Sequence, residues 1–101
     1  MRIEVLYVPG CPNYELAVER LQAVLESQSL EAEIRSLPVR TEAQAKALLL
    51  PGSPTIRIDG EDLEQQGTVT PGLACRLYAD RSGIPSEDLL LIAISNARRR
   101  E

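Results

Sequence analysis

The sequence predicts an α/β protein, in which a four-stranded mixed sheet carries helices on both faces. Segments with strand-like and helix-like periodicity alternate in the order strand, helix, strand, helix, strand, strand, helix. A predicted helix joins the first two strands, so these should be parallel with a right-handed crossover. The last two strands should pair antiparallel. The 101 residues contain no internal repeat and no linker, which indicates a single domain.

The first strand and helix have clear signals. Residues 2–8 are rich in β-branched side chains and end in an apolar run, as in a central strand buried on both faces. Apolar residues then recur at three- and four-residue spacing over 12–27, which is typical of an amphipathic helix. Pro12 suits its first position, where the missing N–H donor has no helical partner to lose.

The second strand and helix are shorter. Residues 31–37 alternate in polarity and are bounded by Pro38, which indicates a strand. Thr41, followed three residues later by Gln44, forms a capping-box pattern. A short helix should start there and end before Pro51 and Gly52.

The second half of the chain predicts two strands and a helix. Residues 55–59 and 73–78 each read as a strand, and the two should pair antiparallel. The polar residues 60–72 between them predict an exposed, mobile loop. Ser86 should cap the last helix, which has acidic residues at its start and arginines at its end, as the helix dipole favours.

Composition excludes several classes of function. The chain has a net charge of −4, no Phe, no Trp and no His. It therefore lacks the basic face and most of the stacking side chains that nucleic-acid binding needs. Without histidine, zinc hydrolases and Ser-His-Asp triads are excluded, and we expect no metal and no cofactor.

The apolar runs and the first residues of the chain give expectations about cellular location. The apolar runs are far shorter than the roughly 20 residues of a membrane span. The first residues alternate instead of forming a basic segment followed by an apolar block. We therefore expect a cytoplasmic protein without membrane contact, in which both cysteines are free thiols.

Two motifs resemble those of the thioredoxin-like superfamily, and the resemblance covers nearly the whole chain. Cys11 follows the first predicted strand and opens the first helix, as the reactive cysteine does in that family. Ser53, Pro54 and Thr55 resemble the segment that contains the family's cis-proline. The resemblance implies the minimal βαβαββα fold, with Pro54 in the cis form facing Cys11. A cis bond there should expose the main chain of Ser53 beside Cys11, as an edge on which an extended peptide or a thiol tripeptide could dock. By composition alone, a trans proline that starts a strand is the ordinary alternative.

The chain departs from the family at the second active-site position. The sequence Cys-Pro-Asn-Tyr places Tyr14 where a C-x-x-C motif has its second cysteine. The resemblance is therefore to a small monothiol, glutaredoxin-like member of bacterial type. It implies that Pro12, Asn13 and Tyr14 line a substrate groove together with residues 53–55. Asn13 as a solvent-facing residue and Tyr14 as a core anchor remain alternatives.

A physical argument that does not use the resemblance also indicates that Cys11 is reactive. A helix N-terminus is an environment that lowers a cysteine pKa from about 8.5 into a range of roughly 3.5 to 7.5. We therefore expect a reactive thiolate at Cys11. The alternative is a small apolar residue packed in a turn. Gly83 and Pro85 resemble the family's loop beside the thiol. The alternative is that they are ordinary turn residues before a helix.

Cys75 is the only internal candidate for a resolving thiol. It shares a predicted strand face with Leu73 and Leu77, so a buried strand residue is the alternative. A disulfide with Cys11 requires α-carbons within about 7 Å.

Two functions follow from these motifs. The first is thiol-disulfide exchange through Cys11, with a small molecule or protein that carries a thiol or disulfide as partner. The alternative is a non-catalytic binding module, which uses its thiols as ligands for a soft metal such as mercury or copper. A third possibility is structural: the exposed strand or the loop 60–72 mediates a homodimer, and the thiols have no role.

Overall fold

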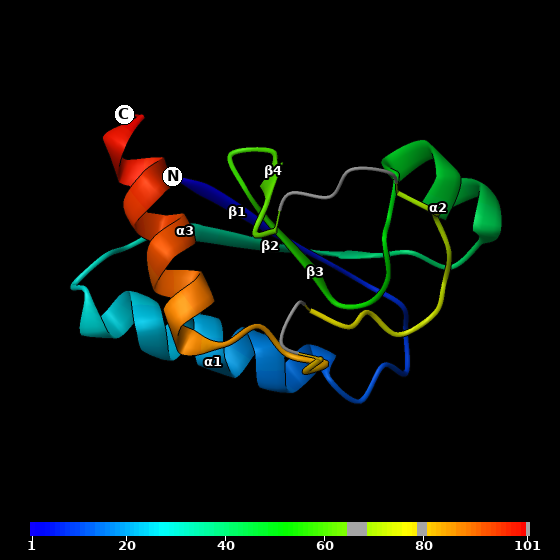
Figure 1. Cartoon of the computed structure of the whole chain (residues 1–101), viewed down its shortest axis with the longest axis horizontal. Coiled ribbons are helices and arrows are strands. Elements are labelled where there is room, and N and C mark those ends of the chain that lie inside the picture. Colours follow the sequence, from blue (N-terminus) through cyan, green and yellow to red (C-terminus); the bar gives the residue numbers. More distant parts are fainter. Residues whose placement is uncertain (65–68, 79–80, 101) are drawn as a thin grey trace.

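The computed structural model describes residues 1–64, 69–78 and 81–100. Its elements follow the predicted order: β1 (Arg2–Tyr7), α1 (Tyr14–Ser27), β2 (Glu33–Pro38), α2 (Glu42–Leu48), β3 (Thr55–Ile58), β4 (Glu61–Asp62) and α3 (Glu87–Arg99). The sheet order is β2-β1-β3-β4, with β1 parallel to β2 and antiparallel to β3 (Figure 1). The prediction of an α/β protein with a four-stranded mixed sheet is confirmed.

The fourth strand is not where the sequence analysis placed it. β4 lies at 61–62, directly after β3, and pairs antiparallel with it. Asp59 and Gly60 make the connecting two-residue turn, and both have positive φ, 52° and 85°. Such turns follow the right-handed twist of a hairpin, and Asp-Gly is one of the pairs they favour. The loop predicted over 60–72 therefore begins with a strand, and its residues 65–68 lie outside the described part of the chain.

Residues 73–78 do not form the predicted strand. They make one isolated bridge, which is parallel and joins Cys75 to Ser53. The predicted antiparallel pairing with 55–59 is wrong because β4 already occupies that edge of β3. The buried side of the segment is also reversed: Arg76 and Tyr78 are buried, whereas Leu77 is 68% exposed.

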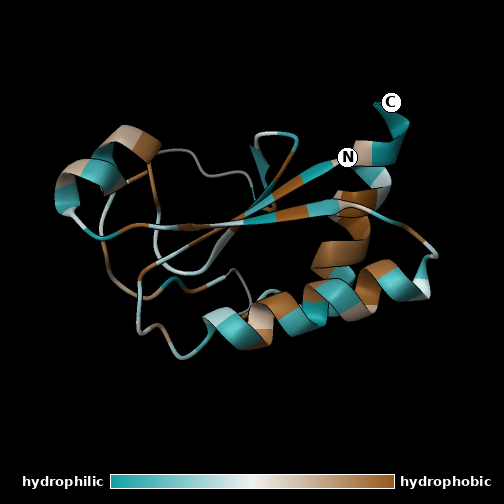
Figure 2. Ribbon diagram, turned by 180° about the vertical axis from the view of Figure 1, so that it is seen from behind, coloured by the Kyte–Doolittle hydropathy of each residue, from teal (hydrophilic) through white to brown (hydrophobic). Residues whose placement is uncertain are grey.

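The main core lies on one face of the sheet, beneath α1 and α3. Its sheet residues are Ile3, Val5, Ile56 and Ile58, and its helix residues are Ala17, Leu21, Val24, Leu25, Leu90, Ile94 and Ala97. Figure 2 shows hydrophobic and hydrophilic residues alternating along α1, as expected of a helix with one buried side. These aliphatic side chains join the two helices to the central strands.

A second, smaller cluster lies where β1 ends. It consists of Leu6, Val39, Ala45 and Leu50. Leu6 follows Val5 in β1, so the two side chains point to opposite faces of the sheet. α2 contributes Ala45 to this cluster and lies beyond the ends of β1 and β2 (Figure 1). The expected cover of helices on both faces is therefore uneven, with two helices on one face and α2 at one end of the other.

Two of the three helices, α2 and α3, begin where their capping signals predicted. Thr41 and Gln44 form the predicted capping box of α2, and the Ser86 hydroxyl accepts a hydrogen bond from the Leu89 amide at the start of α3. α1 differs, because it begins at Tyr14 and not at Pro12. Among the described residues, no helix has the length and apolarity to cross a membrane.

Candidate functional site

Cys11 lies in the turn between β1 and α1. Its amide donates to the Val8 carbonyl at 3.0 Å, and its own carbonyl accepts from the Tyr14 amide at 3.3 Å. Asn13 is the N-cap of α1 and makes no side-chain capping bond. The thiol is free and half-buried, so it is not enclosed in the aliphatic core. Cys11 precedes the first turn of α1 and lies close to its N-terminal end.

The Ser53–Pro54 peptide bond is cis, as the resemblance implied. Ser53 is linked to the strand that leads to Cys11, because its hydroxyl oxygen accepts a hydrogen bond from the Val8 amide at 2.9 Å. The loop before β3 and the turn after β1 are therefore in direct contact. This hydrogen bond joins the two motifs that the sequence analysis singled out.

The expected docking edge at Ser53 is not open. Ser53, Pro54 and Thr55 are all buried, and Ser53 is only 1% exposed. The Ser53 amide donates to the Ala74 carbonyl at 2.9 Å, and its carbonyl accepts from the Arg76 amide at 2.9 Å. The expectation that the main chain of Ser53 is available to a substrate is wrong, because the chain itself pairs there.

Tyr14 is a structural anchor. Its ring stacks on Tyr7, with centroids 3.8 Å apart and planes at 13°. Its hydroxyl donates a hydrogen bond of 2.7 Å to the Ser36 hydroxyl of β2. Tyr14 thus ties the start of α1 to two strands of the sheet, as the core-anchor alternative expects.

Pro12 and Asn13 form the outer rim of the turn. Pro12 is exposed and Asn13 is half-buried. A Cβ atom on Gly83 would collide with the Asn13 amide nitrogen, so the loop before α3 lies directly against this rim. Arg20 of α1 holds the same loop, donating a hydrogen bond of 3.0 Å to the Pro85 carbonyl. Gly83 therefore borders the Cys11 turn, as the resemblance implied.

Cys75 is exposed and is not the buried strand residue of the alternative interpretation. Its thiol is free, and its main chain lies directly opposite Ser53 in the isolated bridge. Cys11 and Cys75 are thus carried by two segments that both make hydrogen bonds with Ser53.

Next to Cys75, the chain buries a charged cluster that the sequence analysis did not predict. Arg76 makes two hydrogen bonds with the Asp62 carboxylate, of 2.8 and 2.7 Å, and one of 3.2 Å with the Thr55 hydroxyl. Glu64 lies 3.9 Å away, and the guanidinium lies 4.4 Å from the centre of the Tyr78 ring. Burial acts to lower the pKa of Arg76, but the hydrogen bond to Asp62 and the surrounding negative charges more than offset it, so the pKa is raised.

Tyr78 completes this cluster. Its hydroxyl donates a hydrogen bond of 2.8 Å to the Pro54 carbonyl. Burial raises the pKa of Tyr78, although the charge of Arg76 acts in the opposite direction. The only signal in the sequence is that Arg76 and Tyr78 are two residues apart, which puts them on one side of an extended segment. Their partner Asp62 is not recognisable from the sequence.

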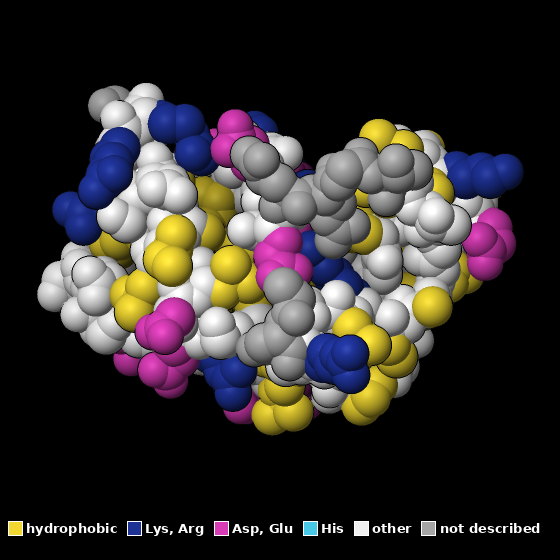
Figure 3. Space-filling view, in the orientation of Figure 1, with side chains coloured by type: hydrophobic (Ala, Val, Ile, Leu, Met, Phe, Trp, Pro, Cys, Tyr) yellow, Lys and Arg dark blue, Asp and Glu magenta, His cyan; other side chains and the backbone are white. Residues whose placement is uncertain are grey.

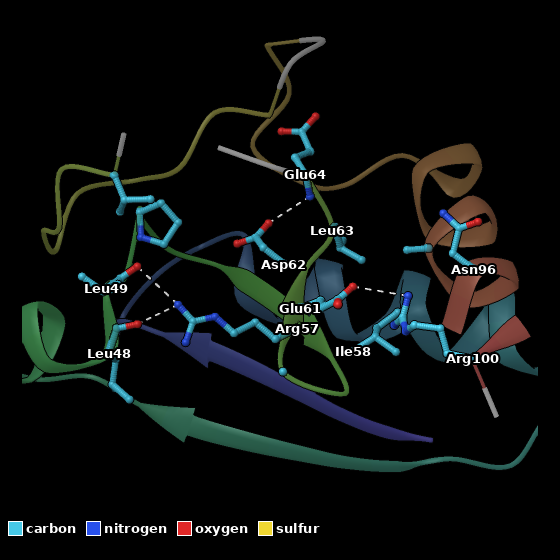
Figure 4. A pocket seen from close by; sticks show the side chains of 14 residues that line it. Leu48, Leu49, Arg57, Ile58, Glu61, Asp62, Leu63, Glu64, Asn96 and Arg100 are labelled. Carbon is cyan, nitrogen blue, oxygen red and sulfur yellow. Dashed lines mark hydrogen bonds and ion pairs between the residues drawn. The ribbon is translucent and has the colours of Figure 1, made fainter. Parts of the chain in front are cut away.

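A separate groove of about 680 Å³ lies between the end of α2, the β3–β4 hairpin and α3 (Figure 4). The charged side chains that line it are bonded to other groups of the chain. Arg57 donates to the carbonyls of Leu48 and Leu49, and Arg100 forms an ion pair of 3.3 Å with Glu61. Figure 3 shows basic side chains gathered at the nearby C-terminal end of α3. Neither cysteine lines this groove.

Within the described ranges, no group of three or more His, Cys, Asp or Glu side chains could hold a metal ion. Two free thiols are the softest ligands that these ranges offer.

Comparisons with protein-family models, with curated proteins and with solved structures found no match for this chain.

Proposed function

We propose that this chain is a thioredoxin-like monothiol exchange protein, in which Cys11 forms and releases mixed disulfides with a small thiol such as glutathione. The element order and the sheet order β2-β1-β3-β4 support this proposal. So does the position of Cys11, which follows the central strand and precedes α1. Cys11 is also free and accessible, as exchange requires.

The observation that carries the proposal is the hydrogen bond from the Val8 amide to the Ser53 hydroxyl. It holds the turn that bears Cys11 against the cis Ser53–Pro54 bond, although the two are more than 40 residues apart in sequence. A thiol and a cis-proline brought together in this way are the pair of features on which the resemblance depends.

The chemistry is a two-step exchange. The Cys11 thiolate attacks one sulfur of a disulfide, a new bond forms to that sulfur, and the other sulfur leaves as a thiolate. A second thiol then attacks the mixed disulfide and restores Cys11.

The structure favours a small disulfide over an extended protein segment. The main-chain groups of Ser53, which a peptide would need for pairing, are already hydrogen-bonded to Ala74 and Arg76. Around Cys11, Pro9, Gly10 and Pro12 are exposed and Asn13 is half-buried, so the turn itself is accessible. A tripeptide thiol needs less of that edge than a protein strand does.

The proposal is tested by exchange with glutathione disulfide. Intact mass should show one glutathione added to the Cys75→Ser variant, and peptide mapping should place it on Cys11. Reduction of a glutathione mixed-disulfide substrate should be lost in Cys11→Ser. If Cys11 in the folded Cys75→Ser protein takes up no glutathione, the exchange function is wrong.

A non-catalytic binding module is the second candidate. Tyr14 favours it, because this side chain replaces the second cysteine and is fully engaged with Tyr7 and Ser36. Such a module would use Cys11 as a soft-metal ligand, with Hg(II) or Cu(I) as the probe. It predicts tight metal binding that Cys11→Ser abolishes, together with no exchange activity in the unmodified protein.

A further inference from the structure

The main chain of Ser53 has a partner within the molecule. Residues 73–76, here called the 73–76 segment, run parallel to Ser53 and use both of its main-chain hydrogen-bonding groups. Cys75 is the residue directly opposite Ser53 in this bridge. The segment therefore occupies the edge at which a substrate peptide was expected, and it carries a thiol there.

The bridge also determines the side on which the Cys75 thiol lies. Residues directly opposite each other in a sheet pairing project their side chains to the same face. The Ser53 side chain is directed at the Val8 amide, and Val8 accepts the hydrogen bond of the Cys11 amide. Cys75 therefore shares the face that leads to the Cys11 turn. In Figure 1, residues 8–13 and the 73–76 segment lie at the same end of the molecule.

The 73–76 segment is held firmly in this position. Arg76 anchors it through two hydrogen bonds to Asp62, and Tyr78 anchors it through Pro54. Its backbone also packs tightly on Gly52, where a Cβ would lie 2.8 Å from the Arg76 α-carbon. Gly52 has a φ of +145°, which also disfavours any larger residue. These contacts fix the residue next to Cys75, so the segment presents Cys75 in one place.

We propose that Cys75 is the resolving thiol of Cys11, so that the two form a reversible internal disulfide despite the tyrosine at position 14. This inference rests on the proposed function, because Cys11 must first react with an external disulfide. It adds a second redox residue and assigns a purpose to the 73–76 segment. The segment acts as an internal substrate for Cys11.

The reaction balances with glutathione disulfide as the oxidant. Cys11 attacks it, forms a mixed disulfide and releases one glutathione thiolate. The Cys75 thiolate then attacks the Cys11 sulfur, the bond from Cys11 to glutathione breaks, and a second glutathione thiolate leaves and takes a proton from water. The protein loses two electrons and two protons, and one glutathione disulfide becomes two thiols.

The experiment compares the unmodified protein with Cys75→Ser and Cys11→Ser. Each is treated with glutathione disulfide, alkylated and measured as an intact mass. The unmodified protein should lose two hydrogens, take up no alkylating agent and carry no glutathione. Cleavage after arginine should then release the peptide with Cys11 linked to the peptide with Cys75. Cys75→Ser should instead accumulate the mixed disulfide at Cys11.

The outcomes separate this inference from the proposed function. If the unmodified protein keeps glutathione on Cys11 and forms no internal disulfide, Cys75 is not a resolving thiol, while exchange at Cys11 stands. If Cys75→Ser takes up no glutathione, the exchange function itself is refuted. An internal disulfide that forms only in denaturant also contradicts the inference, because the folded structure should bring the thiols together.

A second variant tests whether the anchoring matters. Asp62→Asn removes the charge that holds Arg76, so internal disulfide formation should slow several-fold while the first reaction at Cys11 keeps its rate. Arg100→Met is the matched control, because it breaks the exposed ion pair with Glu61 on the same strand. Equal rates of internal disulfide formation in both variants would show that the anchor does not present Cys75.

Discussion

Truncation of Asp62 should strongly destabilise the protein, because it leaves a buried positive charge without its main partner. Asp62→Ala removes two hydrogen bonds to Arg76, whose side chain is 1% exposed. Hydrogen bonds to charged groups contribute about 1.5–3 kcal/mol each, and breaking a buried pair costs about 3–5 kcal/mol. Asp62 is itself 20% exposed, and Glu64 remains 3.9 Å away, so we expect the lower end, about 3 kcal/mol.

Removal of Arg76 should cost less than removal of its partner. Arg76→Met takes the charge out of the interior and fills the space with a flexible apolar side chain that can contact the Tyr78 ring. Replacement of a buried ion pair by apolar groups is often neutral or stabilising. The carboxylate of Asp62 is left with some access to water. We therefore expect a loss of about 1 kcal/mol, and the double variant should be more stable than Asp62→Ala alone.

Urea unfolding followed by circular dichroism gives the free energy of unfolding for each protein. Glu61→Ala is the control, because its ion pair with Arg100 is exposed and should contribute less than about 1 kcal/mol. The reasoning is refuted if Arg76→Met is as destabilising as Asp62→Ala. It is also refuted if the double variant recovers no stability.

Three further measurements test the fold. The pKa of Tyr78 is raised in the folded state, so the neutral tyrosine stabilises the fold. This contribution is complete below the ordinary tyrosine pKa of about 10 and is lost as the pH rises above that value. The urea midpoint should therefore fall more steeply above about pH 10 in the unmodified protein than in Tyr78→Phe, and equal slopes would contradict this. Thr41→Ala removes the cap of α2 and should cost about 1 kcal/mol in urea unfolding, whereas Thr70→Ala at an exposed site should change little. Gly83→Ala should displace the flexible Asn13 amide at a cost below about 1 kcal/mol, which NMR shifts of that amide would detect; unchanged shifts would argue against the contact.

Local signals in the sequence predicted most of the elements. The capping box at Thr41 and the Ser86 cap are formed by neighbouring residues, so the sequence alone was sufficient to locate both helix starts. The periodicity of α1 located its buried side, although its first residue is Tyr14 and not Pro12. Helix boundaries depend on details of the backbone that residue preferences specify to within one or two positions.

The β3–β4 hairpin has a local turn signal, which competes with an apolar pattern farther along the chain. Asp59 and Gly60 are a favoured pair for a two-residue turn, and β4 follows them directly. The alternation of apolar residues over 73–78 suggested a longer strand instead. Leu77 is nevertheless exposed, because the face of Arg76 and Tyr78 is the buried one. A pattern of apolar residues cannot predict that a charged side chain will occupy the interior.

The sequence by itself determined the three helices, the first three strands, the two thiols and the proline before β3, because each of these depends on residues that are adjacent or evenly spaced. Only the tertiary structure decided that Val8 meets Ser53, that Cys75 lies opposite Ser53, and that Asp62 stabilises a buried Arg76. These contacts join segments far apart in the chain. Their free energy depends on the removal of water and on exact distances between charges, and neither quantity is present in a linear pattern of residues.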